Sequence, residues 1–241
     1  MMIKFAIELQ NVQRIMTSLT LPRRSFVTAQ RSRTYFHSPQ IAGERRGEIK
    51  MTEGTTPGSQ FADPAGLGLA GFAMTTFLLS LANANILHES GEVLGLAVFY
   101  GGIAQFLAGL WEYAKGNTFG ATAFCSYGAF WLSFWYLLTK TPSGSFGGNA
   151  VAAYLFVWAI FTAYMTIAAT RTSTAVLLIF VFLTLTFAAL GIGAVSSGHA
   201  GWTKIGGYLG IVTAVLAWYG SFATVTNSTY KRTVLPVGPR N

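Results

Sequence analysis

The chain has 241 residues, of which 52% are hydrophobic and only 10% are charged, and its mean hydropathy is +0.47. A water-soluble domain carries about 25% charged residues, so this composition excludes an ordinary soluble protein. Nine Lys and Arg residues lie within residues 1–50, whereas residues 51–241 hold seven Lys and Arg and five Asp and Glu. The basic excess therefore belongs mainly to an N-terminal tail and does not indicate nucleic-acid binding.

Residues 1–60 are predicted to form a basic, disordered tail outside the membrane body. Five arginines and no acidic residue fall between Asn11 and Pro39, together with many Ser and Thr residues. This composition is typical of an organellar transit peptide, which would place the protein in an inner organellar membrane. Alternatively, the tail is a cytosolic extension, residues 51–60 form the native start at Met51, and the plasma membrane is the expected location.

Six apolar stretches follow the tail, and each is long enough to cross the hydrocarbon core as a helix of about 20 residues. None contains Asp, Glu, Lys or Arg, and none alternates as a barrel strand would. They cover residues 66–87, 93–111, 119–139, 149–170, 174–195 and 205–226. We therefore predict an all-α membrane protein, with six transmembrane helices within residues 61–230 and a C-terminal tail over residues 231–241.

The distribution of basic residues predicts the orientation. An even number of spans places both termini on one face, together with the second and fourth loops. Near the helix ends, that face carries Lys115, Arg171, Lys231 and Arg232, and the other face carries only Lys140 and Lys204. The positive-inside rule then places both termini in the cytosol.

Polar side chains inside the spans are candidates for a pathway through the membrane. In the first span, an i, i+4, i+8, i+11 spacing places four residues on one helical face: Phe72, Thr76, Ser80 and Asn83. In the third span, Thr122 and Ser126 share a face beside Tyr127. The hydroxyl groups can instead bond back to carbonyl oxygens of their own helix, so both interpretations stay open.

Gln105 stands alone in the middle of the second span. An unpaired amide in lipid is costly, so Gln105 either pairs between helices or lines a pathway. The histidines His37, His88 and His199 lie in the tail and the loops, and Cys125 is the single cysteine. Because no catalytic or metal-binding motif occurs, we predict no enzyme activity, no metal site and no cofactor.

The first span opens with the segment Asp-Pro-Ala-Gly-Leu-Gly-Leu at residues 63–69. Proline near a helix start is preorganised for the helix, and the glycines leave backbone N–H groups approachable. A helix N-terminus attracts anions through its free N–H groups and its dipole. This suggests an anion entrance formed by Asp63, Pro64, Ala65, Gly66, Leu67 and Gly68.

The same segment resembles the Asn-Pro-Ala-Pro-Leu-Gly-Leu signature that opens the first helix of the acetate uptake transporter family, the group of succinate–acetate permeases and fungal acetate permeases. Further matching motifs follow in order at residues 99–105 (Phe-Tyr-Gly-Gly-Ile-Ala-Gln), 115–120 (Lys-Gly-Asn-Thr-Phe-Gly) and 232–238 (Arg-Thr-Val-Leu-Pro-Val-Gly). The resemblance covers about residues 61–238. Two positions depart from the signature, because Asp63 replaces Asn and Gly66 replaces Pro.

The resemblance implies a six-helix protomer, a homohexamer, and transport of acetate and related short monocarboxylates, in some members also succinate. Transport would occur by proton-coupled symport or through an anion channel. The family's narrow point maps to Phe72, Tyr127 and Leu183. A carboxylate at position 63 should repel anions unless it is protonated or paired.

Alternatives to this function remain open from the sequence. The pathway could carry ammonium or another small solute, or the chain could be a membrane sensor or assembly protein without flux. If proton coupling exists, Glu112 is the candidate, because it is the only acid that borders an apolar span on the cytosolic side. Alternatively, Glu112 simply pairs with Lys115 at a helix end.

Overall fold

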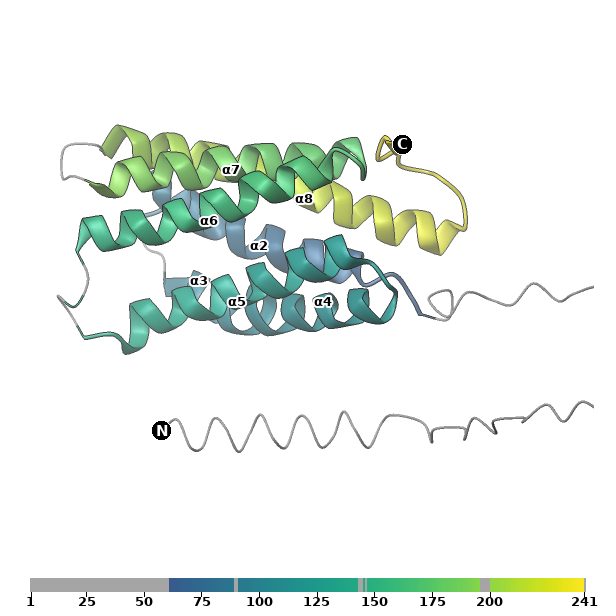
Figure 1. Ribbon diagram of the computed structural model, residues 1–241, viewed down its shortest axis with the longest axis horizontal. Helices are drawn as coiled ribbons and strands as arrows, with labels where there is room; N and C mark the ends of the chain where they lie inside the picture. The colour runs from purple at the N-terminus through teal and green to yellow at the C-terminus, as the bar shows by residue number, and fades with distance from the viewer. Residues whose placement is uncertain (1–60, 89–90, 143–144, 146, 196–199, 241) are drawn as a thin grey trace, which may run out of the picture. The chain divides into compact units, whose positions relative to one another are not determined.

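The computed structural model describes residues 61–88, 91–142, 145, 147–195 and 200–240. The predicted tail at residues 1–60 lies outside the described residues, as does His199. The described elements are α2 (Ala65–Asn83), α3 (Gly91–Val98), the π-helical segment η2 (Phe99–Ala104), α4 (Gln105–Ala114), α5 (Thr118–Lys140), α6 (Gly148–Ala169), α7 (Thr174–Val195) and α8 (Ala200–Tyr230). The long helices run along one common direction (Figure 1).

Each predicted span corresponds to a helical segment, but the first prediction is too long. Helix α2 ends at Asn83 and not at Leu87, because the chain turns at Ala84 and Asn85. Asn85 has a φ of 59°, the left-handed conformation that often ends a helix and that Asn tolerates better than most residues. Only the type of residue 85 gives a hint of this end in the sequence.

Five helical segments are long and apolar enough to cross a membrane, judged by length and composition: Ala65–Asn83, Gly91–Ala114, Gly148–Ala169, Thr174–Val195 and Gly201–Tyr230. Helix α5 is not among them, because its Trp, Tyr, Ser and Thr side chains lower its hydropathy. With 23 residues it is about 34 Å long, which matches a hydrocarbon core of about 30 Å. The described residues therefore provide five to six candidate membrane helices.

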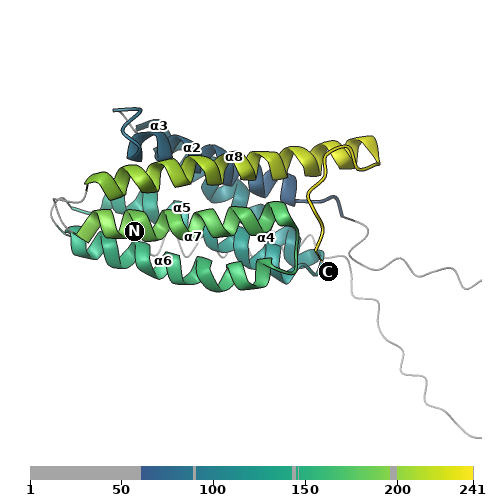
Figure 2. The same ribbon diagram turned by 90° about the horizontal axis from the view of Figure 1, so that it is seen from above.

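Helix α2 lies at the centre of the packing. It runs along α8 on one side and contacts η2 and α4 on the other, while α7 lies between α6 and α8 and α4 packs on α5 (Figure 2). By contrast, the backbones of α5 and α6 lie mostly apart, although these helices follow each other in the chain. Long side chains bridge the two helices, among them Tyr127 of α5 and Tyr154 of α6. The candidate site is lined by both helices together with α2, α7 and α8.

The π-helical segment interrupts the second predicted span where it meets α2. A Cβ atom added at Gly71 of α2 would lie 2.7 Å from the carbonyl oxygen of Tyr100 in η2, so only glycine allows this close approach. In η2, a Cβ atom added at Gly101 would likewise lie 2.8 Å from the Cβ atom of Thr75 and 2.9 Å from the Cδ1 atom of Trp131. π-Helical turns are rare and frequently occur near functional sites. The apolar pattern of residues 93–111 predicts one continuous span and did not indicate this break.

The C-terminal segment folds back onto the start of α7. The backbone N–H groups of Thr174 and Ala175 donate to the carbonyl oxygens of Gly238 (2.7 Å) and Val237 (3.1 Å). These bonds satisfy two N–H groups that have no partner inside helix α7. Asn227 of α8 holds the same segment, because its Oδ1 accepts from Val234 N (2.7 Å) and Leu235 N (2.9 Å).

Candidate functional site

A cavity of about 470 Å³ lies between α2, α5, α6, α7 and α8. It is surrounded by the last turns of α2, α5 and α7 and the first turns of α6 and α8, so it occupies one end of the helical bundle. We call this cavity the vestibule. Most of its lining is apolar, and the polar side chains on its wall are Thr76, Ser80, Asn83, Tyr154, Thr186 and Thr203.

Two of the three residues assigned to the narrow point, Phe72 and Leu183, form part of the vestibule wall. Tyr127 packs behind Phe72, with 5.6 Å between the ring centroids. The side chains of Phe72, Tyr127 and Leu183 belong to one buried cluster and are only 5%, 3% and 3% exposed. The structure therefore brings all three together in one buried apolar cluster at the inner end of the vestibule, and we call these three residues the ring.

The hydroxyl group of Tyr127 already has a hydrogen-bond partner. It lies 2.9 Å from Thr162 Oγ1, and this threonine donates its own proton to the carbonyl oxygen of Trp158 (2.7 Å). Since a threonine hydroxyl has one proton, Tyr127 is the donor in the bond to Thr162. A carboxylate that bonds to the phenol proton must therefore compete with Thr162.

The predicted polar face of α2 lines the vestibule, since Phe72, Thr76, Ser80 and Asn83 all belong to its wall. Thr76 Oγ1 is buried and has no hydrogen-bond partner among the described residues. The sequence reasoning missed Thr186, although its i+3 spacing from Leu183 places both on one face. It also missed Tyr154, which reaches the wall from α6 and bonds to Ser133 (2.6 Å) without any sequence signal.

Three other candidates lie away from the vestibule. Gln105 is fully buried and faces Gly71 of α2, and neither of its amide atoms has a hydrogen-bond partner within the described ranges. Thr122 and Ser126 are half-buried on α5 and do not belong to the vestibule wall.

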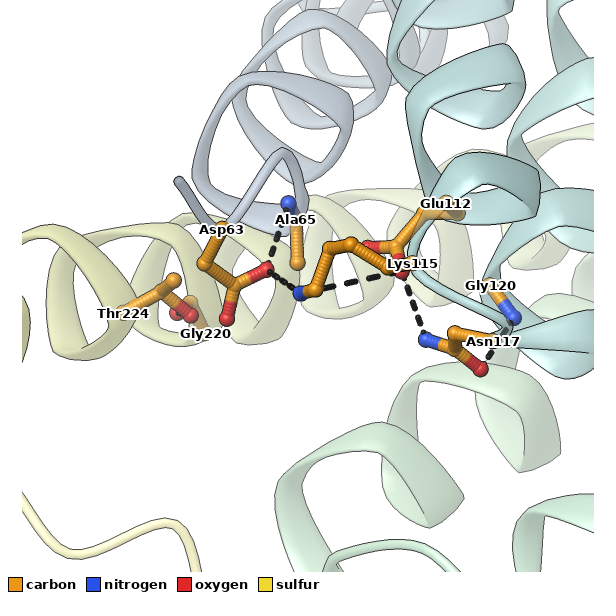
Figure 3. Close-up of polar contacts among 8 residues, drawn as sticks. All are labelled: Asp63, Ala65, Glu112, Lys115, Asn117, Gly120, Gly220 and Thr224. Atoms are coloured by element: carbon orange, nitrogen blue, oxygen red, sulfur yellow. Dashed lines mark hydrogen bonds and ion pairs between the residues drawn. The ribbon is translucent and has the colours of Figure 1, made fainter. Parts of the chain in front are cut away.

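At the opposite end of the bundle, α2, α4 and α5 bring together four polar side chains: Asp63, Glu112, Lys115 and Asn117 (Figure 3). We call them the mouth cluster. Lys115 Nζ forms an ion pair with Asp63 Oδ1 (2.9 Å) and lies 3.9 Å from Glu112 Oε2. Asn117 Nδ2 donates to Glu112 Oε2 (2.8 Å), and Asn117 Oδ1 accepts from Gly120 N (3.1 Å), which caps α5.

Glu112 lies inside helix α4, which extends beyond the predicted end of the second span at Trp111. Helix α4 continues past Trp111 to Ala114, so the side chain of Glu112 turns into the protein and is only 1% exposed. Its Oε1 atom has no hydrogen-bond partner among the described residues. The predicted contact with Lys115 exists at 3.9 Å, but Lys115 lies closer to Asp63.

The entrance segment is less open to anions than its sequence suggested. The N–H group of Ala65 donates to Asp63 Oδ1 (3.1 Å), so the chain's own carboxylate occupies this amide. The carbonyl oxygen of Gly66 accepts a hydrogen bond from Ser221 of α8 (2.7 Å), and a Cβ atom at Gly68 would lie 2.8 Å from the ring of Phe124. Pro64 precedes the helix, and Leu67 is 46% exposed.

Comparison with known proteins places the chain in a family. Residues 46–239 match the model of the GPR1/FUN34/yaaH family. The chain belongs to this family. The solved structure of the bacterial acetate channel SatP is similar, with a TM-score of 0.70 and 40% sequence identity, over 74% of this chain and 99% of that one.

Two relatives of named function are similar to this chain to about the same degree. The succinate-acetate/proton symporter SatP of Escherichia coli (strain K12) is 41% identical over 187 residues, which are 75% of this chain and 97% of that protein. Ammonia transport outward protein 2 of Saccharomyces cerevisiae is 42% identical over 179 residues, which are 70% of this chain but only 63% of that protein. The resemblance to acetate uptake transporters is therefore confirmed, and the helical fold matches that of the acetate channel.

Proposed function

We propose that this chain carries acetate and similar short monocarboxylates across a membrane. The observation that supports this most strongly is the ring of Phe72, Tyr127 and Leu183 at the inner end of an apolar vestibule, in a chain 40% identical to an acetate channel of the same fold. The bacterial relative named as a succinate-acetate/proton symporter supports the same class of substrate.

The chemistry of the ring suits a small acid with one methyl group. The methyl group loses little by passing apolar side chains, and the carboxyl group finds the Tyr127 hydroxyl there. A larger or doubly charged acid loses more hydration at such a constriction. Because the rings of Phe72 and Tyr127 are in contact, passage requires these two side chains to move apart.

Uptake of labelled acetate into proteoliposomes tests this function. We expect uptake above that of protein-free vesicles, and inhibition by unlabelled propionate. The yeast relative is named for ammonia transport, so ammonium serves as the second competitor. Inhibition by ammonium without inhibition by propionate would favour the alternative substrate.

We further propose that Glu112 couples transport to protons if the mechanism is symport. Its support is geometric, because the carboxyl group is buried, one oxygen has no partner among the described residues, and Lys115 lies 3.9 Å from the other. An imposed pH gradient with and without a protonophore separates symport from a channel. In symport, a protonophore abolishes the acetate accumulation that the pH gradient drives. In a channel, the acetate flux driven by a membrane potential remains.

We propose a plasma-membrane homohexamer with both termini in the cytosol. In support of a common face for the termini, the start of α2 and the C-terminal segment lie at the same end of the bundle (Figure 1). Exposed apolar side chains such as Phe99 (72%) and Ile167 (73%) suit lipid or neighbouring copies. Protease protection in sealed vesicles tests the orientation. Fluorescence microscopy of a tagged chain tests the location. Native mass spectrometry tests the number of subunits.

A further inference from the structure

We propose that Asp63 is a specificity-determining residue, which sets the charge of the mouth cluster and thereby disfavours dicarboxylates relative to monocarboxylates. This inference rests on the proposed function, because it concerns which anions the same pathway admits. It follows from the position of the cluster, from its charges and from the dependence of electrostatic energy on the charge of the passing anion.

The mouth cluster lies on the helices that carry the ring. Asp63 precedes α2 and Asn117 caps α5 (Figure 3). Helix α2 carries Phe72, and α5 carries Tyr127. At 1.5 Å per residue, nine or ten residues along either helix correspond to about 14 Å between the cluster and the ring. An anion that moves between the ring and this end of the bundle therefore comes close to the cluster.

The charges of the cluster do not balance. Two carboxyl groups, those of Asp63 and Glu112, share the single ammonium group of Lys115, which lies 2.9 Å from one and 3.9 Å from the other. Asp63 is 46% exposed and Lys115 is 22% exposed, whereas Glu112 is only 1% exposed. Solvent and a passing anion therefore meet mainly the Asp63–Lys115 pair. Whatever the protonation state of Glu112, removal of the Asp63 charge makes the cluster one unit more positive.

The electrostatic energy of a passing anion is proportional to its own charge. A change at the mouth that alters monoanion entry by some factor therefore alters dianion entry by the square of that factor. One unit of charge at about 8 Å from a monoanion, in a water-like dielectric and at low salt, changes the entry of that monoanion by a factor of about two. The ratio of dicarboxylate to monocarboxylate flux should then change about twofold. High salt should abolish the change, because the Debye length falls to about 3 Å at 1 M.

The test measures initial rates of labelled succinate and acetate uptake into proteoliposomes, at about 10 mM and about 1 M salt. Asp63→Asn is nearly isosteric and keeps the Oδ1 atom that accepts from Ala65 N. We expect it to raise the succinate-to-acetate ratio about twofold at low salt and to have no effect at high salt. Lys115→Gln should lower the ratio by a similar factor. The double variant restores the wild-type charge and should restore the wild-type ratio.

Several results would overturn the inference. One is a succinate-to-acetate ratio in Asp63→Asn that is unchanged at low salt, and another is no succinate uptake by this variant. A change of the ratio in the same direction in Asp63→Asn and Lys115→Gln would also overturn it. So would a change of the ratio that persists at high salt. Asp63→Glu keeps the charge, so a ratio like that of Asp63→Asn would mean that packing decides selectivity and would also overturn it. If the wild type transports no acetate above empty vesicles, the proposed function itself fails, which is a distinct result.

Discussion

Truncation of Phe72 should open the inner end of the vestibule. Phe72 is 5% exposed, lines the vestibule and contacts the aromatic side chain of Tyr127. Phe→Ala substitutions in cores cost about 3–5 kcal/mol, and the lower end applies here because the side chain already borders a cavity. One methylene group of misfit in an apolar pocket changes selectivity by about tenfold or more. Phe72→Ala should therefore raise uptake of butyrate relative to acetate by at least about tenfold.

The assay compares initial rates of labelled butyrate and acetate in proteoliposomes that contain equal amounts of folded protein. Phe77→Ala is the matched control, because Phe77 lies on the same helix but packs on Trp218 of α8, with 4.9 Å between the ring centroids, and does not line the vestibule. We expect the control to keep the wild-type ratio. An unchanged ratio in a folded Phe72→Ala protein would refute the assignment of Phe72 to the narrow point.

Three further substitutions test separate parts of the structure. In a symport mechanism, Glu112→Gln should abolish the accumulation of acetate that a pH gradient drives. The variant should still exchange labelled for unlabelled acetate when the concentrations inside and outside the vesicles are equal. Normal accumulation by the variant would exclude Glu112 from proton coupling. Tyr127→Phe should lower the free energy of unfolding, measured by denaturant titration, by only about 1 kcal/mol. The loss is small because the Thr162 hydroxyl, which loses its bond to Tyr127, keeps its bond to the carbonyl oxygen of Trp158. A loss above about 3 kcal/mol would contradict this. Asn227→Ala should expose the C-terminal segment to trypsin at Arg232, and protection equal to that of Ser228→Ala would show that Asn227 does not hold it.

The sequence was sufficient to predict the helices and one wall of the vestibule. Apolar stretches without charge have few alternatives in a membrane, and the spacing of Phe72, Thr76, Ser80 and Asn83 follows from the geometry of a single helix. The same reasoning could not locate the end of α2, because a left-handed turn at Asn85 depends on one residue. Likewise, it gave no sign that Glu112 would be buried, because one additional helical turn decides which way its side chain points.

Contacts between helices were the least predictable part of the site. The ion pair between Asp63 and Lys115 joins residues 52 positions apart, and neither residue type indicates its partner. The hydrogen bond from Tyr127 to Thr162 and the position of Tyr154 depend on how α5 and α6 approach each other. Gln105 illustrates the same limit, since its burial against Gly71 could not be distinguished in advance from a place on the pathway.

Initial uptake of labelled acetate into proteoliposomes tests the central claim most directly. The account predicts that the wild-type protein takes up acetate faster than protein-free vesicles of the same lipid, and that excess unlabelled propionate slows this uptake. Uptake equal to that of empty vesicles, from protein shown to be folded and inserted, would contradict it.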